Sequence, residues 1–307
     1  MSDLLKLFDL HDRVALVTGG AGLLGGEFCH TLAEAGAKVV VADINLESTD
    51  QLVRRLQAEG FTAVGLTLDV TEVDSVNRVV EQTLQVYNHL DILVNCAALD
   101  PKFDPQRGGF PSHLLRTSMP PKRHPADLSR TQVRDMTPAG QLGGHTNSFE
   151  DYPLEAWNQA LNINLTGTFL CCQAAARPML AQGKGVIINL ASIYGITAPD
   201  QRLYQREGQP AQYKPAYYPV TKAGILALTA YLAAYYAGRN IRVNAISPGG
   251  VYHGHDEQFV RAYSARTILG RMADKDDMNG ALLYLASDAS AYVTGANLVV
   301  DGGWSVW

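Results

Sequence analysis

Short, nearly continuous apolar runs alternate along the chain with longer segments in which apolar residues recur at helical spacing. The apolar runs lie at residues 13–18, 37–42, 62–69, 91–95, 185–191, 241–247 and 297–303. Residues 46–60 have the spacing of an amphipathic helix that ends at Gly60, and the segment after the first run is helical in pattern to Ala35. Strands that are apolar throughout are typical of parallel sheets covered on both faces. The pattern predicts an α/β fold, a doubly wound parallel sheet flanked by helices.

Two long stretches interrupt this alternation, at about residues 99–150 and 193–215. Connections from a strand to a helix usually have a handful of residues, and much longer ones are often functional. Both stretches leave the carboxyl ends of expected strands, which is the edge where open α/β sheets bind ligands. We therefore expect two active-site loop insertions in one domain of residues 1–307, because no internal repeat or glycine- and serine-rich linker divides the chain.

Composition narrows the class of protein. The chain has 307 residues, of which 47% are hydrophobic and 18% charged, and its net charge is −5. This balance gives no support for a nucleic-acid partner or an anionic membrane surface. No apolar run reaches membrane-spanning length, and the first residues lack a signal-peptide pattern. Four cysteines without a C-x-x-C pair fit a reducing compartment, so we expect a cytoplasmic protein.

The segment T-G-G-A-G-L-L-G, residues 18–25, lies between the first expected strand and the first helix. Glycines at 19, 22 and 25 allow a tight turn, close approach of backbone to a pyrophosphate, and close helix–strand packing. The helix that follows would present its free N–H groups to the phosphates. Asp43 ends the second strand, where a carboxylate accepts bonds from an adenosine ribose. No arginine follows Asp43, which favours NAD over NADP.

A second candidate motif is Y-P-V-T-K at residues 218–222, preceded by Tyr217. Residues four apart share a helix face, so Tyr218 and Lys222 should lie together while Tyr217 points elsewhere and packs. Pro219 is compatible with a helix that begins here, because a proline in the first turn removes no hydrogen bond. A tyrosine and a lysine one turn apart are more often a surface pair. This motif therefore indicates catalysis only when it occurs together with the other motifs of the chain.

Eight motifs occur in order and together resemble the short-chain dehydrogenase/reductase family. Besides the two above they are L-D-V at 68–70, N-C-A-A at 95–98, N-I-N-L-T-G at 162–167, I-N-L-A-S at 188–192, R-V-N-A-I-S-P-G at 242–249 and V-T-G-A-N-L-V-V-D-G-G at 293–303. The resemblance covers nearly the whole chain except the two insertions, and it implies a Rossmann-type sheet. It implies a catalytic set of Asn164, Ser192, Tyr218 and Lys222.

The resemblance also implies a role for each of these residues. Tyr218 would exchange a proton with the substrate oxygen while hydride passes to or from the nicotinamide, and Ser192 would hold that oxygen. Lys222 would bind the nicotinamide ribose and lower the pKa of Tyr218, and Asn164 would retain a water that links Lys222 to solvent. One ammonium a few ångströms away supplies about 4 kcal/mol at an effective dielectric constant of ~20. A phenol ordinarily has a pKa near ~10, so this interaction would lower the pKa of Tyr218 by roughly 2–3 units, closer to neutrality.

The implied cofactor contacts extend over most of the sheet edge. They are Gly19, Gly22, Leu24, Gly25, Asp43, Ile44, Asp69, Val70, Asn95, Ala97, Tyr218, Lys222, Pro248, Gly249 and Val251. Two positions depart from the family pattern: Leu23 stands where a glycine is usual, and His253 stands where a threonine is common. The glycine spacing is similar to that of the extended branch, which includes nucleotide-sugar epimerases and dehydratases. H-G-H-D-E at 253–257 fits no compact metal motif, and no metal is expected.

The two insertions should contain the residues that recognise the substrate. Between residues 99 and 148 stand seven Lys or Arg against four Asp, a balance of +3. A basic lid such as one carrying Arg116, Lys122 and Arg123 would favour an anionic substrate, and a solvated loop or a subunit contact is the equal alternative. Within the family the chain looks most like bacterial members of surface-glycan sugar biosynthesis, followed by gluconate and polyol dehydrogenases.

These observations predict an NAD-dependent oxidoreductase that interconverts a secondary alcohol and a ketone on a polar, carbohydrate-derived substrate such as a sugar or sugar acid. One alternative is an epimerase- or dehydratase-like enzyme without net cofactor turnover. Another is a non-catalytic NAD-binding regulator. The family resemblance and the apolar helices beside the site also imply a homotetramer or a homodimer.

Overall fold

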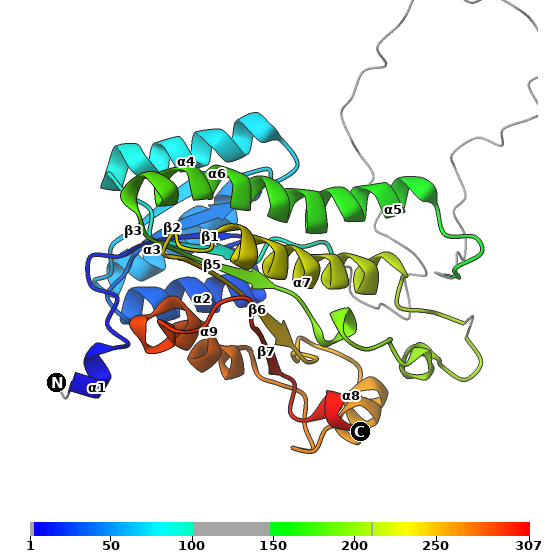
Figure 1. Ribbon diagram of the computed structural model, residues 1–307. Coiled ribbons are helices and arrows are strands. Elements are labelled where there is room, and N and C mark those ends of the chain that lie inside the picture. Colours follow the sequence, from blue (N-terminus) through cyan, green and yellow to red (C-terminus); the bar gives the residue numbers. More distant parts are fainter. Residues whose placement is uncertain (1–2, 101–147, 210) are drawn as a thin grey trace, which may run out of the picture.

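A parallel β-sheet forms the centre of the protein (Figure 1). The computed structural model describes residues 3–100, 148–209 and 211–307. Within these ranges the sheet has seven strands in the order β3-β2-β1-β4-β5-β6-β7, all parallel. They are β1 (Val14–Thr18), β2 (Lys38–Asp43), β3 (Ala63–Thr67), β4 (Ile92–Asn95), β5 (Gly185–Leu190), β6 (Ile241–Pro248) and β7 (Asn297–Val300). The strand order reverses between β1 and β4, which creates the crevice that binds ligands in such sheets.

Helices cover both faces of the sheet, as predicted (Figure 1). One face packs against α2 (Leu23–Glu34), α3 (Leu46–Ala58) and α9 (Asn279–Ala286). The other packs against α4 (Val73–Tyr87), α6 (Gly167–Gln182) and α7 (Tyr217–Tyr235). The remaining α-helices of the described residues are α1 (Asp3–Lys6), α5 (Leu154–Leu161) and α8 (Glu257–Ser264). The predicted α/β fold is therefore confirmed.

The central strands are apolar throughout because both of their faces are buried. In β5 the neighbours Ile187 and Ile188 are both inaccessible to solvent, yet they belong to the two opposite cores. Successive side chains of a strand point to opposite faces, so a continuous apolar run serves both helical layers at once. Burying one such side chain contributes about 1.5–3 kcal/mol. This packing gives the site above it a rigid base.

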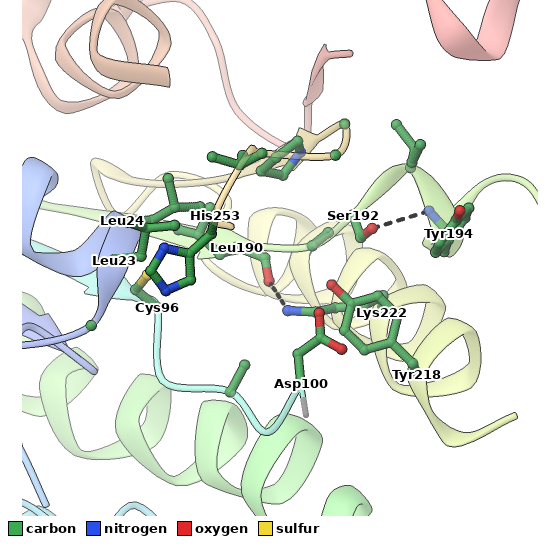
Figure 2. A pocket seen from close by; sticks show the side chains of 18 of the residues that line it. Leu23, Leu24, Cys96, Asp100, Leu190, Ser192, Tyr194, Tyr218, Lys222 and His253 are labelled. Atoms are coloured by element: carbon green, nitrogen blue, oxygen red, sulfur yellow. Dashed lines mark hydrogen bonds between the residues drawn. The ribbon is translucent and has the colours of Figure 1, made fainter. Parts of the chain in front are cut away.

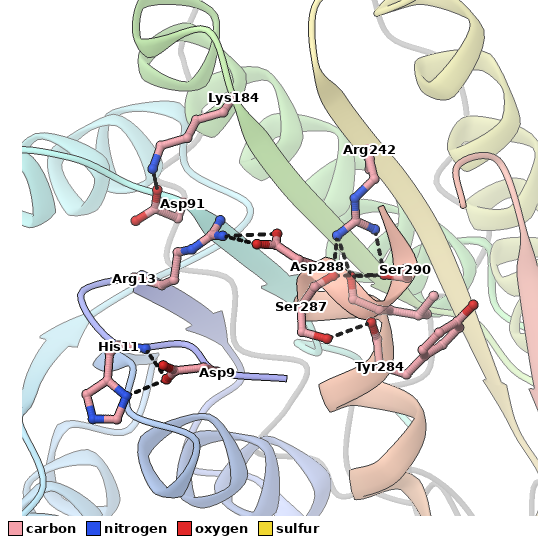
Figure 3. A network of polar contacts seen from close by, with 11 residues as sticks. Asp9, His11, Arg13, Asp91, Lys184, Arg242, Tyr284, Ser287, Asp288 and Ser290 are labelled. Atoms are coloured by element: carbon pink, nitrogen blue, oxygen red, sulfur yellow. Dashed lines mark hydrogen bonds and ion pairs between the residues drawn. The ribbon is translucent and has the colours of Figure 1, made fainter. Parts of the chain in front are cut away.

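Charged groups fix the amino ends of the strands, on the edge away from the crevice (Figure 3). Arg13, just before β1, donates two hydrogen bonds of 3.0 Å to the carboxylate of Asp288. Arg242 in β6 donates to the carbonyl oxygens of Leu285 (3.1 Å) and Ser287 (3.0 Å) at the end of α9. Carbonyls at the end of a helix have no partner within the helix, so Arg242 supplies a needed donor.

Of the two insertions, the second lies within the described residues except for residue 210. It contains the 3-10 turns Ile193–Gly195 and Gln201–Tyr204, and two ion pairs hold it against the segment around α8. Arg206 pairs with Asp256 at 2.6 Å, and Asp200 pairs with Arg266. The basic lid, including Arg116, Lys122 and Arg123, lies outside the described residues.

Three further expectations bear on partners and metals. In the described parts of the chain, no helix has the length and apolar character needed to cross a membrane. Nor do those parts hold a group of three or more His, Cys, Asp or Glu side chains placed to bind a metal ion. All four cysteines are free thiols.

Candidate active site

Tyr218 and Lys222 lie in the first turns of α7, with Pro219 between them in the first turn. The Lys222 ammonium stands 5.7 Å from the centroid of the Tyr218 ring, as the spacing of four residues predicts. Tyr217 points the other way and is fully buried against Leu99 and Ala160. The helix start therefore separates two adjacent tyrosines, one in the core and one at the sheet edge.

Ser192 reaches the same place from the end of β5. Its backbone is extended, and its Oγ accepts a hydrogen bond of 3.2 Å from the backbone N–H of Tyr194, which fixes the side chain (Figure 2). Lys222 donates a hydrogen bond of 2.8 Å to the carbonyl oxygen of Leu190, two residues before Ser192. Gly195 lets the two segments approach, because a Cβ there would lie 2.8 Å from the backbone of Lys222. The end of β5 and the start of α7 are thus locked together.

Asn164 is buried one layer behind these residues, in a π-helical turn at Asn162–Thr166. Its amide group holds the backbone of Leu99 at both polar atoms. The Leu99 N–H donates to Oδ1 at 2.6 Å, and Nδ2 donates to the Leu99 carbonyl at 3.1 Å. Nδ2 also contacts Oγ1 of Thr221 at 3.4 Å, next to Lys222. π-Helical turns are rare and are often found at functional sites. Here the turn aims one amide at the first residue of the first insertion.

A cavity of about 470 Å³ runs along the carboxyl ends of the strands, and its ends carry different chemistry (Figure 2). Leu23, Leu24, Cys96 and His253 lie toward one end, and Ser192, Tyr218 and Lys222 toward the other. Most of the expected site residues line it: Gly19, Gly22, Leu24, Gly25, Asp43, Ala97, Ser192, Tyr218, Lys222, Pro248, Gly249 and Val251. Among the described residues, Ile44, Asp69, Val70, Asn95 and Asn164 stand outside the lining.

Two of the residues outside the lining, Asp69 and Asn95, make hydrogen bonds to neighbouring parts of the fold. Asp69 accepts hydrogen bonds from the N–H and the hydroxyl of Thr71 at the turn before α4. Asn95 is buried and donates to Oδ1 of Asn189 at 2.8 Å. Their expected contacts with a dinucleotide stay predictions.

The glycine turn has the features that a dinucleotide phosphate requires. Gly19 has a φ of +63°, and a Cβ there would lie 2.6 Å from Cα of Ala97, across the crevice between β1 and β4. Gly22 is the N-cap of α2, so the free N–H groups of the first turn, at Leu23 and Leu24, open at the cavity. Asp43 lies at the other side of the turn and accepts a hydrogen bond of 3.1 Å from the Ala21 N–H. The residues present therefore fit a nicotinamide dinucleotide.

The expected lowering of the Tyr218 pKa is not what these groups produce. Burial raises the pKa of Tyr218 well above its ordinary value, and the Asp100 carboxylate raises it further, while a hydrogen bond with Ser192 opposes both. Burial also lowers the pKa of Lys222 to about 8. The sequence argument counted the attraction of Lys222 and omitted the cost of removing water from both groups, which is the larger effect here. In this environment Tyr218 is held as a neutral phenol, the form that donates a proton.

Aromatic residues from distant segments form a wall of the cavity beside Tyr218. Tyr194 and Tyr204 come from the second insertion, and the Tyr204 hydroxyl donates to that of Tyr194 at 3.3 Å. Tyr263 comes from α8, stacks on Trp304 with ring centroids 4.2 Å apart, and accepts a hydrogen bond from the Gly250 N–H. Such rings offer apolar faces with hydroxyl groups at their edges. Sequence reasoning missed them, because their spacing carries no periodic signal.

An ion pair that the sequence did not indicate also borders the cavity. Asp100 follows β4, and Lys214 precedes α7; Lys214 Nζ lies 2.5 Å from Oδ1 of Asp100. The same ammonium stands 4.0 Å from the centroid of the Tyr218 ring, nearer than that of Lys222. The reacting end of the cavity thus holds two cations and one carboxylate.

Two family models match the chain in consecutive parts. The model described as short chain dehydrogenase matches residues 13–111, and the one described as Enoyl-(Acyl carrier protein) reductase matches residues 137–305. The chain belongs to the short-chain dehydrogenase/reductase family. It is therefore an oxidoreductase that acts on CH–OH groups with a nicotinamide cofactor.

Similar members of this family carry different names and cofactors. D-threitol dehydrogenase of Mycolicibacterium smegmatis is 31% identical over 97% of this chain and 95% of its own. The crystal structure of a gluconate 5-dehydrogenase from Burkholderia cenocepacia with NADP and tartrate has a TM-score of 0.76 at 29% identity, over 99% of both chains. A short-chain dehydrogenase from Leptospira borgpetersenii with bound NAD+ has a TM-score of 0.73 at 31% identity, over 97% and 94%.

Proposed function

We propose that this dehydrogenase uses NAD to interconvert a secondary alcohol and a ketone on a polyhydroxylated, carbohydrate-derived substrate. The observation that carries the proposal is the convergence of Ser192, Tyr218 and Lys222 on the cavity that the first turn of α2 and Asp43 border at its other end. The names of relatives that act on threitol and gluconate support a polyol or sugar-acid substrate. Tyrosine hydroxyls around the reacting end are suited to a substrate that is itself rich in hydroxyl groups.

Each residue of the site has a task in this reaction. When bound, the dinucleotide would supply or accept the hydride at the reacting carbon. Tyr218 would donate its proton to the ketone oxygen in reduction and take it back in oxidation, and Ser192 would hold that oxygen by a hydrogen bond. Lys222 would bind the nicotinamide ribose and stabilise the phenolate that Tyr218 becomes after donation. Asn164, behind the site, would hold both the start of the first insertion and the proton path at Lys222.

The choice of NAD rests on Asp43 and its neighbours. Its two oxygens accept one backbone hydrogen bond each, from Ala21 (3.1 Å) and Asn45 (3.0 Å), and a carboxylate has further lone pairs for ribose hydroxyls. A 2′-phosphate at that place would meet this carboxylate, and the next residues, Ile44 and Asn45, carry no positive charge. The carboxylate therefore favours the cofactor without the phosphate.

Replacing Asp43 by alanine is expected to lower the ratio of kcat/KM for NAD to that for NADP by about tenfold or more, because a repulsion of roughly 1–2 kcal/mol is removed. Steady-state kinetics with both cofactors measure the ratio. Glu47→Ala, which removes a carboxylate from the nearby start of α3, is the matched control and should leave the ratio as it is. An unaltered ratio in Asp43→Ala would count against NAD as the preferred cofactor.

A screen of polyols, sugar acids and nucleotide sugars with NAD tests the reaction itself, by the absorbance of NADH. Stoichiometric NADH formation distinguishes a dehydrogenase from an epimerase- or dehydratase-like enzyme that returns the hydride to its substrate. Dinucleotide binding without turnover of any substrate would favour the non-catalytic regulator instead.

We further propose that copies of the chain associate as a homodimer or a homotetramer. Exposed apolar side chains on neighbouring surface helices support this: Phe169 on α6, and Val220, Tyr231 and Tyr235 on α7. The rings of Tyr231 and Tyr235 stack with centroids 5.9 Å apart. Burying such rings against a second copy would remove them from water. A monomeric mass by light scattering at micromolar concentration would refute it.

A further inference from the structure

The ion pair of Asp100 and Lys214 joins the two insertions at the reacting end of the cavity. Asp100 lies at the beginning of the first insertion and Lys214 near the end of the second, 114 residues apart in the chain. Both line the cavity together with Tyr218, and the carboxylate of Asp100 lies close to Tyr218 and Lys222 (Figure 2). The pair therefore borders the space where a substrate would meet Tyr218.

Side-chain amides hold the backbone of Lys214 and that of Leu99, the residue before Asp100. Gln201 holds Lys214 directly, since the Lys214 N–H donates to its Oε1 at 2.8 Å and its Nε2 donates to the Lys214 carbonyl at 3.2 Å. Asn164 holds Leu99, the neighbour of Asp100, in the same two-point manner at 2.6 and 3.1 Å. A backbone fixed at Lys214 and next to Asp100 reduces the conformational entropy that these residues lose when they bind a ligand. The pair is thus organised before any substrate arrives.

Stability gives little reason for an ion pair at this place. The Lys214 side chain is 13% exposed and that of Asp100 is 43% exposed, so both have lost part of their water. Exposed ion pairs contribute little to stability, and for buried pairs the cost of desolvation often cancels the attraction. Apolar side chains would cover the Tyr218 ring at least as well. A role in binding explains the charges better.

The chemistry of the pair fits a hydroxyl group. Of the three donors of the Lys214 ammonium, one is used by Asp100, and the carboxylate has lone pairs left. A hydroxyl both accepts and donates, so it can accept from Lys214 while it donates to Asp100. A carboxylate ligand would have to compete with Asp100 for the same ammonium and would face its charge.

We infer that Asp100 and Lys214 bind a substrate hydroxyl on the carbon next to the reacting one, so that the enzyme selects vicinal diols over simple secondary alcohols. This inference rests on the proposed function and adds to it the group that the site recognises. A hydrogen bond to a charged group discriminates by roughly 10- to 150-fold. A preference of that size separates polyols from ordinary alcohols.

The test compares cyclohexanol with 1,2-cyclohexanediol, oxidised with NAD, in the wild type, Lys214→Met and Asp100→Asn. The wild type should favour the diol in kcat/KM by about tenfold or more, and each variant should lower this diol-to-alcohol ratio by about tenfold. The ratio is the readout because Lys214 also lies over Tyr218 and would affect both substrates alike. Lys275→Met removes another ion-paired lysine, partnered by Glu27 away from the cavity, and should keep the ratio.

The outcomes separate this inference from the function beneath it. If the wild type oxidises neither alcohol nor any polyol while it still binds NADH, measured by fluorescence, the proposed function fails and the inference with it. If the wild type is active and both variants keep its ratio, the function stands and the inference is wrong. A loss in Lys214→Met that is confined to sugar acids would also overturn it, in favour of an anion site. If Lys214→Met fails to fold, the diol-to-alcohol ratio of the isosteric variant Asp100→Asn still tests the inference.

Discussion

Tyr218→Phe is expected to lower kcat by about 10²–10⁴-fold, the usual contribution of a positioned acid or base. The change removes one oxygen and leaves the ring in place. Lys214 lies over this ring, whose centroid is 6.4 Å from that of the Tyr194 ring. Because the shape of the cavity is kept, the dissociation constant for NADH should change less than about threefold. Steady-state kinetics and fluorescence titration measure the two quantities separately.

Tyr217→Phe is the matched control for this prediction. Tyr217 is the adjacent residue of the same helix, but its ring is buried against Leu99 and Ala160 and does not line the cavity. Losing a buried hydroxyl there should alter stability by about 1 kcal/mol and leave kcat within a fewfold of the wild type. A Tyr218→Phe enzyme that keeps a tenth of the wild-type rate would refute the acid–base role of Tyr218.

The fold and the core of the site could be predicted because they depend on short-range patterns. Apolar runs such as 185–191 gave the strands, and β5 is buried at every residue. The turn at residues 18–25 lies between β1 and α2, as its glycines require. Tyr218 and Lys222 share a face because helix geometry is the same in every protein. Each of these predictions needed neighbours that are close in sequence.

The groups that sequence reasoning missed depend on long-range placement. Asp100 and Lys214 meet only because the two insertions leave the adjacent strands β4 and β5, and the aromatic wall joins Tyr194 to Tyr263 of another segment. The predicted lowering of the Tyr218 pKa was wrong for the same reason. The sequence shows the nearby Lys222, but it does not show how little water reaches the hydroxyl or that Asp100 lies beside it. Solvent exclusion is a property of the whole fold.

Gly25→Ala is expected to displace the turn that holds the dinucleotide. A Cβ at Gly25 would lie 2.0 Å from the carbonyl oxygen of Gly19 and 2.9 Å from Cα of Gly20, and both are backbone atoms that cannot rotate away. The helix must therefore move off the turn, which costs about 1–3 kcal/mol of folding free energy, as overpacking generally does. Since the first turn of α2 faces the cavity, we expect NADH affinity to fall more than tenfold.

Gly26→Ala separates this contact from helix propensity. Gly26 is the next residue of α2, and a Cβ there would have its nearest neighbours at 3.9 Å, an ordinary contact distance. Alanine is favoured over glycine in a helix by about 1 kcal/mol, and both substitutions gain that amount. Gly26→Ala should therefore unfold at the same or a higher denaturant concentration than the wild type and bind NADH normally. Gly25→Ala should unfold at a lower denaturant concentration and bind NADH more weakly. If the two variants behaved alike, the third glycine of the motif would not be needed for close packing of α2 on β1, and the phosphate site would have to be assigned on other grounds.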